Sequence, residues 1–135
     1  MKTAVLRLCA LALVAAVLLS LGACAYQISV NYGHSEYYTE KEMDKAVDLI
    51  LDEYKKLEGL RVTAFAYGGD TACDKSWPTL KETAGAENAV ECLLIYTLHD
   101  EKDGQEDVRW LWSFVREKKG DWKLLQYGPE AEEEA

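Results

Sequence analysis

The chain has 135 residues and a formal net charge of −9 at pH 7, with 24 acidic residues against 15 basic ones. This length suffices for one domain with its own core, but not for two. An acidic chain is repelled by nucleic-acid phosphates and by anionic lipid head groups, so we expect no nucleic-acid partner and no membrane binding through surface charge.

The first 23 residues are typical of a secretory signal peptide. Lys2 and Arg7 supply a positive start, and an almost uninterrupted apolar run extends from Leu8 to Leu21. This run is too short and wrongly flanked for a membrane-spanning helix, although a retained signal anchor is the alternative. Removal of residues 1–23 leaves 13 basic and 24 acidic residues, so the mature chain carries a net charge of −11.

The residues around the predicted cleavage site determine how the mature chain is held. Leu21-Gly22-Ala23-Cys24 resembles the bacterial lipobox, in which the cysteine receives a diacylglycerol and the signal is cut just before it. The resemblance implies that Cys24 is lipidated and anchors an extracytoplasmic protein in the cell membrane. Two or three acyl chains hold a protein firmly on a bilayer, whereas one chain is marginal. The alternative is ordinary cleavage after Ala25, which would release a secreted soluble domain.

Two cysteines remain once the signal is removed and Cys24 is lipidated. Cys73 and Cys92 are a candidate disulfide in an oxidising compartment, and the bridge would stabilise the fold by roughly 3 kcal/mol in the chain-entropy model. Two reduced thiols are the alternative. Neither zinc nor redox chemistry is indicated, because the chain has no Cys-x-x-Cys motif and no His at ligand spacing.

The clearest predicted element is a helix that begins after Thr39. Thr39-Glu40-Lys41-Glu42 is a capping box, and Gly59 is expected to end the helix. Residues 24–38 are polar and rich in tyrosine, and we expect a tether there, with a short strand as the alternative. An apolar stripe at helical spacing is expected to face the core: Met43, Ala46, Val47, Ile50, Leu51, Tyr54 and Leu57.

Two strands and a long connection are expected next. Residues 60–67 are rich in β-branched and aromatic side chains and predict a strand. Residues 71–88 form a connection with room for a short helix at 79–84. Residues 89–99 are apolar on both faces, which indicates a strand at the centre of the sheet.

A tryptophan-rich hairpin closes the predicted sheet. Residues 108–117 and 122–127 alternate around a turn that contains Gly120, and they hold three of the four tryptophans. The acidic loop 100–107 fails the spacing of an EF-hand and is expected to be a turn. Residues 129–135 predict a solvated acidic tail.

Aromatic side chains on the predicted strands are the candidate ligand site. A concave apolar surface of the kind that binds ligands would result if four of them share the face opposite the helix: Tyr67, Tyr96, Trp110 and Trp112. Packing in the core is the alternative.

Catalytic motifs are absent from the sequence. It has no Gly-x-Ser-x-Gly, no His-Glu-x-x-His and no phosphate loop. His99 and Asp100 are neighbours on a strand, so they point to opposite faces and form no acid/base pair. We therefore expect a protein that is not an enzyme and that binds neither a cofactor nor a metal.

The hairpin also carries a family resemblance. It resembles the small lipoproteins of Gram-positive bacteria whose domain is cystatin-like, also called nuclear-transport-factor-2-like. The resemblance covers residues 39–128, and the acid/base pair of enzymatic relatives has no clear counterpart here. The matching positions are Trp110, Trp112, Phe114, Arg116, Gly120, Trp122, Lys123, Tyr127 and Gly128.

The expected fold class is α+β, with one N-terminal helix packed on a curved antiparallel sheet of about four strands. The expected function is that of a non-enzymatic binding or accessory module of the cell envelope, with a protein or small-molecule ligand. A small enzyme with a pocket between helix and sheet, and a purely structural envelope component, are the alternatives.

Overall fold

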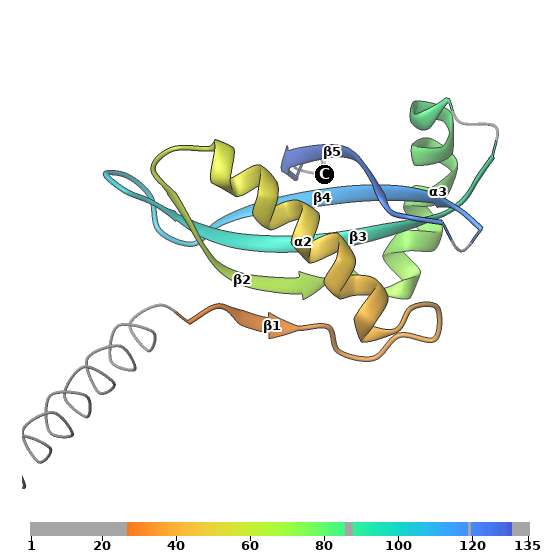
Figure 1. Ribbon diagram of the computed structural model, residues 1–135, viewed down its shortest axis with the longest axis horizontal. Helices are drawn as coiled ribbons and strands as arrows, with labels where there is room; N and C mark the ends of the chain where they lie inside the picture. The colour runs from red at the N-terminus through yellow and green to blue at the C-terminus, as the bar shows by residue number, and fades with distance from the viewer. Residues whose placement is uncertain (1–26, 86–87, 119, 131–135) are drawn as a thin grey trace, which may run out of the picture.

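The fold is a five-stranded mixed sheet with two helices packed on it (Figure 1). The computed structural model describes residues 27–85, 88–118 and 120–130. The strands lie side by side in sequence order, and β1 pairs with β2 in parallel while the other neighbours are antiparallel. The elements are β1 Ser29–Asn31, α2 Glu40–Lys56, β2 Leu60–Tyr67, α3 Asp70–Ala84, β3 Ala89–Glu101, β4 Val108–Glu117 and β5 Lys123–Pro129.

The α+β class with a helix on a sheet is confirmed, but the expected number of strands and the position of the helix are wrong. The first described element is β1, which lies within the predicted tether and pairs Ser29 with Ala64 of β2. All three residues of β1 are exposed, so its sequence has no buried face that would have marked it as a strand. The sheet is therefore mixed, and the folded domain begins before Thr39.

The long connection after β2 is mostly a helix. A short helix at 79–84 was expected, whereas α3 runs for 15 residues from Asp70 to Ala84 with Pro78 inside it. Proline lacks the amide hydrogen and usually interrupts a helix, so the sequence favoured a break at this point. The helix survives because one side packs on the sheet through Cys73 and Leu80, both of which are 3% exposed.

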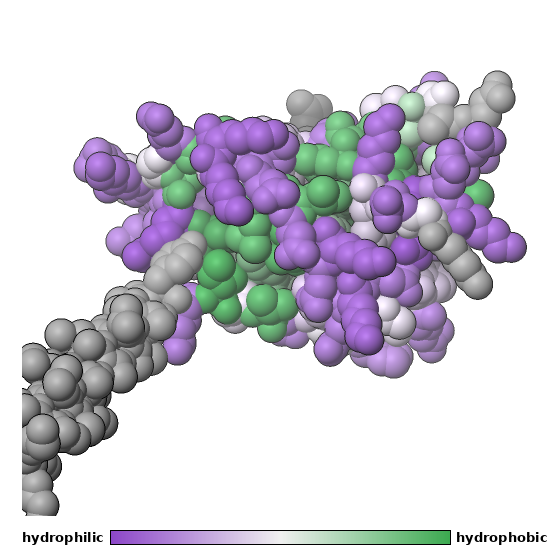
Figure 2. Space-filling model, viewed as in Figure 1, coloured by the Kyte–Doolittle hydropathy of each residue, from purple (hydrophilic) through white to green (hydrophobic). Residues whose placement is uncertain are grey.

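Helix α2 follows the sequence prediction. The Thr39 hydroxyl oxygen accepts the Glu42 amide at 3.3 Å, as the capping box requires. The buried stripe of Met43, Ala46, Val47, Ile50 and Tyr54 faces the sheet. Figure 2 shows hydrophilic side chains over the outer surface of this helix and apolar side chains along its edges.

The two helices cover opposite faces of the sheet. Tyr54 of α2 contacts Thr97 and His99 of β3, whereas Cys73 of α3 contacts Cys92. Odd- and even-numbered residues of this part of β3 point to opposite faces, because side chains alternate along a strand. β3 pairs with β2 on one side and β4 on the other, which confirms its predicted central position.

The tryptophan hairpin is confirmed, with shifted boundaries. β4 pairs with β5 from Val115 opposite Lys123 to Trp110 opposite Pro129. Trp122 precedes β5, and Pro129 belongs to the strand, although it was expected to end the ordered domain. β5 is an edge strand, the position in a sheet where proline is tolerated.

Candidate functional site

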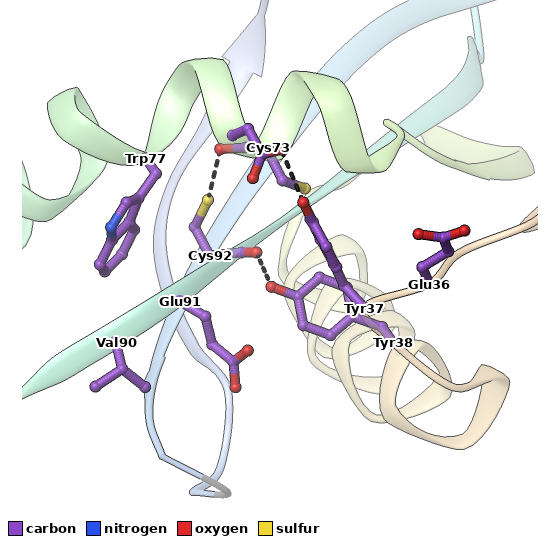
Figure 3. Close-up of a pocket in the computed structure, with 9 residues that line it drawn as sticks. Glu36, Tyr37, Tyr38, Cys73, Trp77, Val90, Glu91 and Cys92 are labelled. Atoms are coloured by element: carbon purple, nitrogen blue, oxygen red, sulfur yellow. Dashed lines mark hydrogen bonds between the residues drawn. The ribbon is translucent and has the colours of Figure 1, made fainter.

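The candidate site is a pocket of about 410 Å³ at the end of the sheet where the segment before α2 meets α3 and β3 (Figure 3). We call it the Cys73 pocket. Three aromatic side chains, three carboxylates, two thiols and one valine line it, and none of these described lining residues is basic. They are Tyr37, Tyr38, Trp77, Glu36, Asp74, Glu91, Cys73, Cys92 and Val90.

Asp70, in the first turn of α3, holds the segment before α2 in place. Its carboxylate accepts the Ser35 hydroxyl at 2.6 Å, the Tyr67 hydroxyl at 2.6 Å and the Glu36 amide at 2.8 Å. Burial raises the pKa of Asp70, but these hydrogen bonds favour the charged form and keep the pKa below its usual value. The Asp70 carboxylate thereby fixes one wall of the Cys73 pocket.

Two consecutive tyrosines of this wall have different roles. Tyr38 is 7% exposed, and its hydroxyl donates to the Cys92 carbonyl at 2.5 Å. Its ring packs edge-on against Trp122, with ring centres 5.3 Å apart. Tyr37 is 49% exposed at the rim, where its hydroxyl donates to Asp74 at 2.8 Å. Tyr38 therefore joins the core, while Tyr37 is available to a ligand.

Val90 and Trp77 complete the exposed apolar part of the pocket. Val90 is 50% exposed, although the alternation of strand 89–99 predicts it on the same buried face as Cys92. A register shift between Ala89 and Glu91 changes the pairing with β4 at this point. The irregularity leaves an apolar side chain at the pocket rim, beside the half-buried Trp77 of α3.

The two cysteines predicted as a pair lie together in the pocket as free, buried thiols. The Cys92 thiol donates to the Cys73 carbonyl at 3.3 Å, and the Cys73 sulfur lies 3.6 Å from the Tyr67 hydroxyl. Interaction with the Cys92 thiol, together with the Tyr67 hydroxyl, lowers the pKa of Cys73 to about 7 against the opposing effect of burial. The predicted proximity is present, and the covalent bond stays a prediction.

The four predicted ligand-face aromatics do not share one face. Trp112 is fully buried beneath α2, and its indole nitrogen donates to Thr97 at 2.8 Å. Trp110 lies half-buried on the same side, with its ring centre 4.5 Å from that of His99. Tyr96 is on the opposite face under the Arg109 guanidinium. Only Tyr67 reaches the Cys73 pocket region, through its hydroxyl.

His99 belongs to a closed polar network between α2 and the sheet. It is fully buried, and its Nδ1 lies 2.8 Å from the Tyr54 hydroxyl, which in turn contacts Thr97 at 2.8 Å. Within the described residues its Nε2 has no hydrogen-bond partner, and the ring packs edge-on against Trp110. Burial lowers the pKa of His99. Tyr54 packs against His99 and Trp112 between α2 and the sheet, where the alternative hypothesis expects an enzyme pocket.

Sequence reasoning did not bring Asp70, Tyr37, Trp77 and Val90 together in one site. Asp70 directly after Gly68-Gly69 is a recognisable helix start, and it is the one local signal that marked this region. The other three come from separate elements, and only the tertiary fold brings them to one pocket.

The chain matches no protein-family model, no curated protein and no solved structure in the comparisons made. In the described ranges, no helix is long and apolar enough to cross a bilayer. The same residues hold no cluster of three or more His, Cys, Asp or Glu side chains placed to bind a metal ion.

Proposed function

We propose that this chain is a non-enzymatic binding module of the bacterial cell envelope, lipid-anchored through Cys24, that takes a cationic partner at the Cys73 pocket. The partner would be a peptide segment or small molecule that carries an ammonium or guanidinium group beside apolar surface. The observation that carries the proposal is the pocket lining, in which Glu36, Asp74 and Glu91 accompany three aromatic rings without a basic side chain. Carboxylates and aromatic faces both attract organic cations.

Charge balance within the pocket favours this polarity. Glu91 is neutralised by Arg116, whose Nε donates to it at 2.7 Å. Asp74 accepts only a neutral tyrosine hydroxyl, and Glu36 uses its backbone amide rather than its carboxylate for the contact with Asp70. Two of the three carboxylates therefore lie beside the exposed Tyr37 ring without a cationic partner among the interactions described.

The position of the pocket fits an anchored protein. Cys24 precedes β1 by five residues, so an extended chain would place the domain within about 18 Å of the bilayer. β1 runs parallel to β2 and starts near the end of the sheet that carries the β3–β4 loop, whereas α3 and the pocket lie at the other end (Figure 1). A lipid on Cys24 would leave the pocket facing away from the membrane.

The fold assignment that supports this function is a cystatin-like domain. Helix α2 packed across the antiparallel strands β2 to β5, together with the tryptophan hairpin, supports that assignment. β1 and α3 would be additions to it, and α3 supplies three residues of the pocket.

Intact mass of the protein purified from membranes tests the anchor. We expect a mature chain that begins at a diacylated Cys24, and a Cys24→Ala control that lacks the lipid. A soluble chain that begins at Tyr26 would refute the anchor and leave a secreted domain.

Titration followed by the Trp77 indole NMR signal tests the ligand class. The amidated peptide Lys-Phe-Lys should shift this signal saturably, and the matched peptide Glu-Phe-Glu should not. Asp74→Asn should weaken the binding by about threefold to tenfold through loss of one charge. Asp103→Asn, in the exposed loop at the far end of the sheet, is the matched control. Equal responses to both peptides, or equal losses in both variants, would refute a cation site.

A further inference from the structure

The two thiols of the Cys73 pocket come from different elements and are separated by 19 residues in sequence. Cys73 projects from α3 and Cys92 from β3, and both line the pocket although each is only 3% exposed (Figure 3). The Cys92 thiol donates to the backbone carbonyl of Cys73 at 3.3 Å, so the two residues are in direct contact. A Cys-x-x-Cys search cannot find such a pair, which explains why the sequence indicated no redox chemistry.

A chain of hydrogen-bonding groups leads from one of these thiols to a carboxylate. Tyr67 has one hydroxyl proton, which it can donate to Asp70 at 2.6 Å or to the Cys73 sulfur at 3.6 Å. Asp70 also accepts from Ser35 and the Glu36 amide, so it keeps two donors when Tyr67 donates to the sulfur. A hydroxyl that donates to the Cys73 thiolate stabilises the charged form and lowers the pKa of Cys73.

The second thiol has a different environment. The Cys92 thiol points its proton at the Cys73 carbonyl, and no described hydroxyl donates to its sulfur. Interaction with Cys73 and burial both raise the pKa of Cys92, while the pKa of Cys73 is lowered. A thiolate is the form that attacks a disulfide, so Cys73 should attack a disulfide more readily than Cys92.

We propose that Cys73 and Cys92 form a reversible redox pair that exchanges with a disulfide entering the pocket, with Cys73 attacking first and Cys92 resolving. In the first step the Cys73 thiolate bonds to one sulfur of the incoming disulfide, whose sulfur–sulfur bond breaks and releases one thiolate. In the second step Cys92 loses its proton and attacks the Cys73 sulfur, which releases the second thiol and leaves a Cys73–Cys92 bond. Both cysteines are oxidised, the incoming disulfide is reduced to two thiols, and the two cysteine protons end on these thiols.

The pocket charge selects the disulfide. Glu36 and Asp74 favour a disulfide that carries amines and repel one that carries carboxylates. This selectivity rests on the cation preference of the proposed function, whereas formation of the internal bond does not. Mass spectrometry of the internal bond therefore tests the redox pair, and the peptide titration separately tests the cation preference.

The experiment compares cystamine, a diamine disulfide, with 3,3′-dithiodipropionate, its dicarboxylate counterpart, on the folded mature protein. Timed quenching, mass spectrometry and peptide mapping follow the products. We expect cystamine to give a product lighter by two hydrogen atoms and linked from Cys73 to Cys92, and to react about tenfold faster than the dicarboxylate. The rate should rise with pH as the Cys73 thiol, whose pKa is lowered, ionises. Dithiothreitol should reverse the product.

Variants identify the order of attack. Cys92→Ser should stop at a mixed disulfide on Cys73, and Cys73→Ser should leave Cys92 unmodified over the same time. Iodoacetamide on the unmodified chain gives the same information without a substitution, because Cys73 should be alkylated first. Tyr67→Phe should slow the first step by about tenfold, since the Cys73 thiolate loses its hydrogen-bond donor. Tyr96→Phe, another strand tyrosine whose hydroxyl donates to a carboxylate, should not slow it.

Three results would overturn the proposal: first reaction at Cys92, no internal bond in the folded protein, or equal slowing by Tyr67→Phe and Tyr96→Phe. Equal rates for cystamine and the dicarboxylate, with a normal internal bond, would overturn the charge selectivity alone.

Discussion

Replacement of Arg116 by Met should destabilise the domain strongly. The Arg116 side chain is 11% exposed and joins two elements by donating to Glu42 of α2 and to Glu91 of β3. Its guanidinium also lies 4.1 Å from the centre of the Trp122 ring. Methionine has a similar apolar stem but cannot make any of these polar contacts, so the substitution isolates their contribution.

The expected loss in the free energy of unfolding is about 3 kcal/mol. A hydrogen bond to a charged group contributes roughly 1.5–3 kcal/mol, and a cation over an aromatic ring adds about 1 kcal/mol. The two carboxylates are 30% and 33% exposed, so water can partly solvate them once the arginine is gone. The loss therefore lies at the lower end of the roughly 3–5 kcal/mol seen when a fully buried pair is broken.

Urea unfolding at pH 7 measures this loss, with Arg109→Met as the matched control. Arg109 also stacks on a ring, that of Tyr96, and pairs with Glu130 at 3.8 Å, but its side chain is 57% exposed. The control should lose about 1 kcal/mol or less. Arg116→Lys should lose less stability than Arg116→Met but more than none, because an ammonium lacks the planar set of donors with which a guanidinium binds two carboxylates at once. Equal losses for the two arginines would refute the reasoning.

Three further outcomes are expected. The pKa of His99 is lowered in the folded state, so the neutral ring contributes its full stability above the unfolded-state pKa of about 6.5. Urea unfolding from pH 5 to 8 should show the free energy of unfolding decrease as the pH falls below that value, and His99→Gln should make this pH dependence weaker. Thr39→Ala should cost about 1 kcal/mol of unfolding free energy through loss of the helix cap, whereas Thr83→Ala, at an exposed helix position, should change it little; equal losses would contradict the cap assignment. Asp70→Asn should speed hydrogen exchange at the Glu36 amide, which donates to that carboxylate, and unchanged exchange would show that Asp70 does not hold this segment.

Elements that depend on short-range spacing were predictable. The Thr39 cap and the stripe from Met43 to Tyr54 predict α2, and alternation around the turn at Gly120 predicts the tryptophan hairpin. In both cases one face of a regular element is buried, and the period of that face is written in consecutive residues. β1 has no buried face, so its weak alternation could not distinguish a strand from a tether.

The interior of α3 shows how packing overrides a local signal. Pro78 argues against a continuous helix, yet the contacts of Cys73 and Leu80 with the sheet hold one together. The alternation of strand 89–99 likewise misplaced Val90, because a register shift is a property of two strands rather than of one. Such features depend on a partner that lies far away in the sequence.

By itself, the sequence determined the α+β class, the capped helix and the pairing of the last two strands, whereas the export signal and the lipidation of Cys24 stay predictions. Only the tertiary structure decided that Tyr37, Cys73 and Cys92 meet in one pocket, and that Trp112 and His99 are sealed beneath α2. The physical reason is the distance in sequence between the residues that interact. Secondary structure follows from side chains a few residues apart, whereas a pocket is formed by elements whose proximity depends on how the whole sheet is ordered.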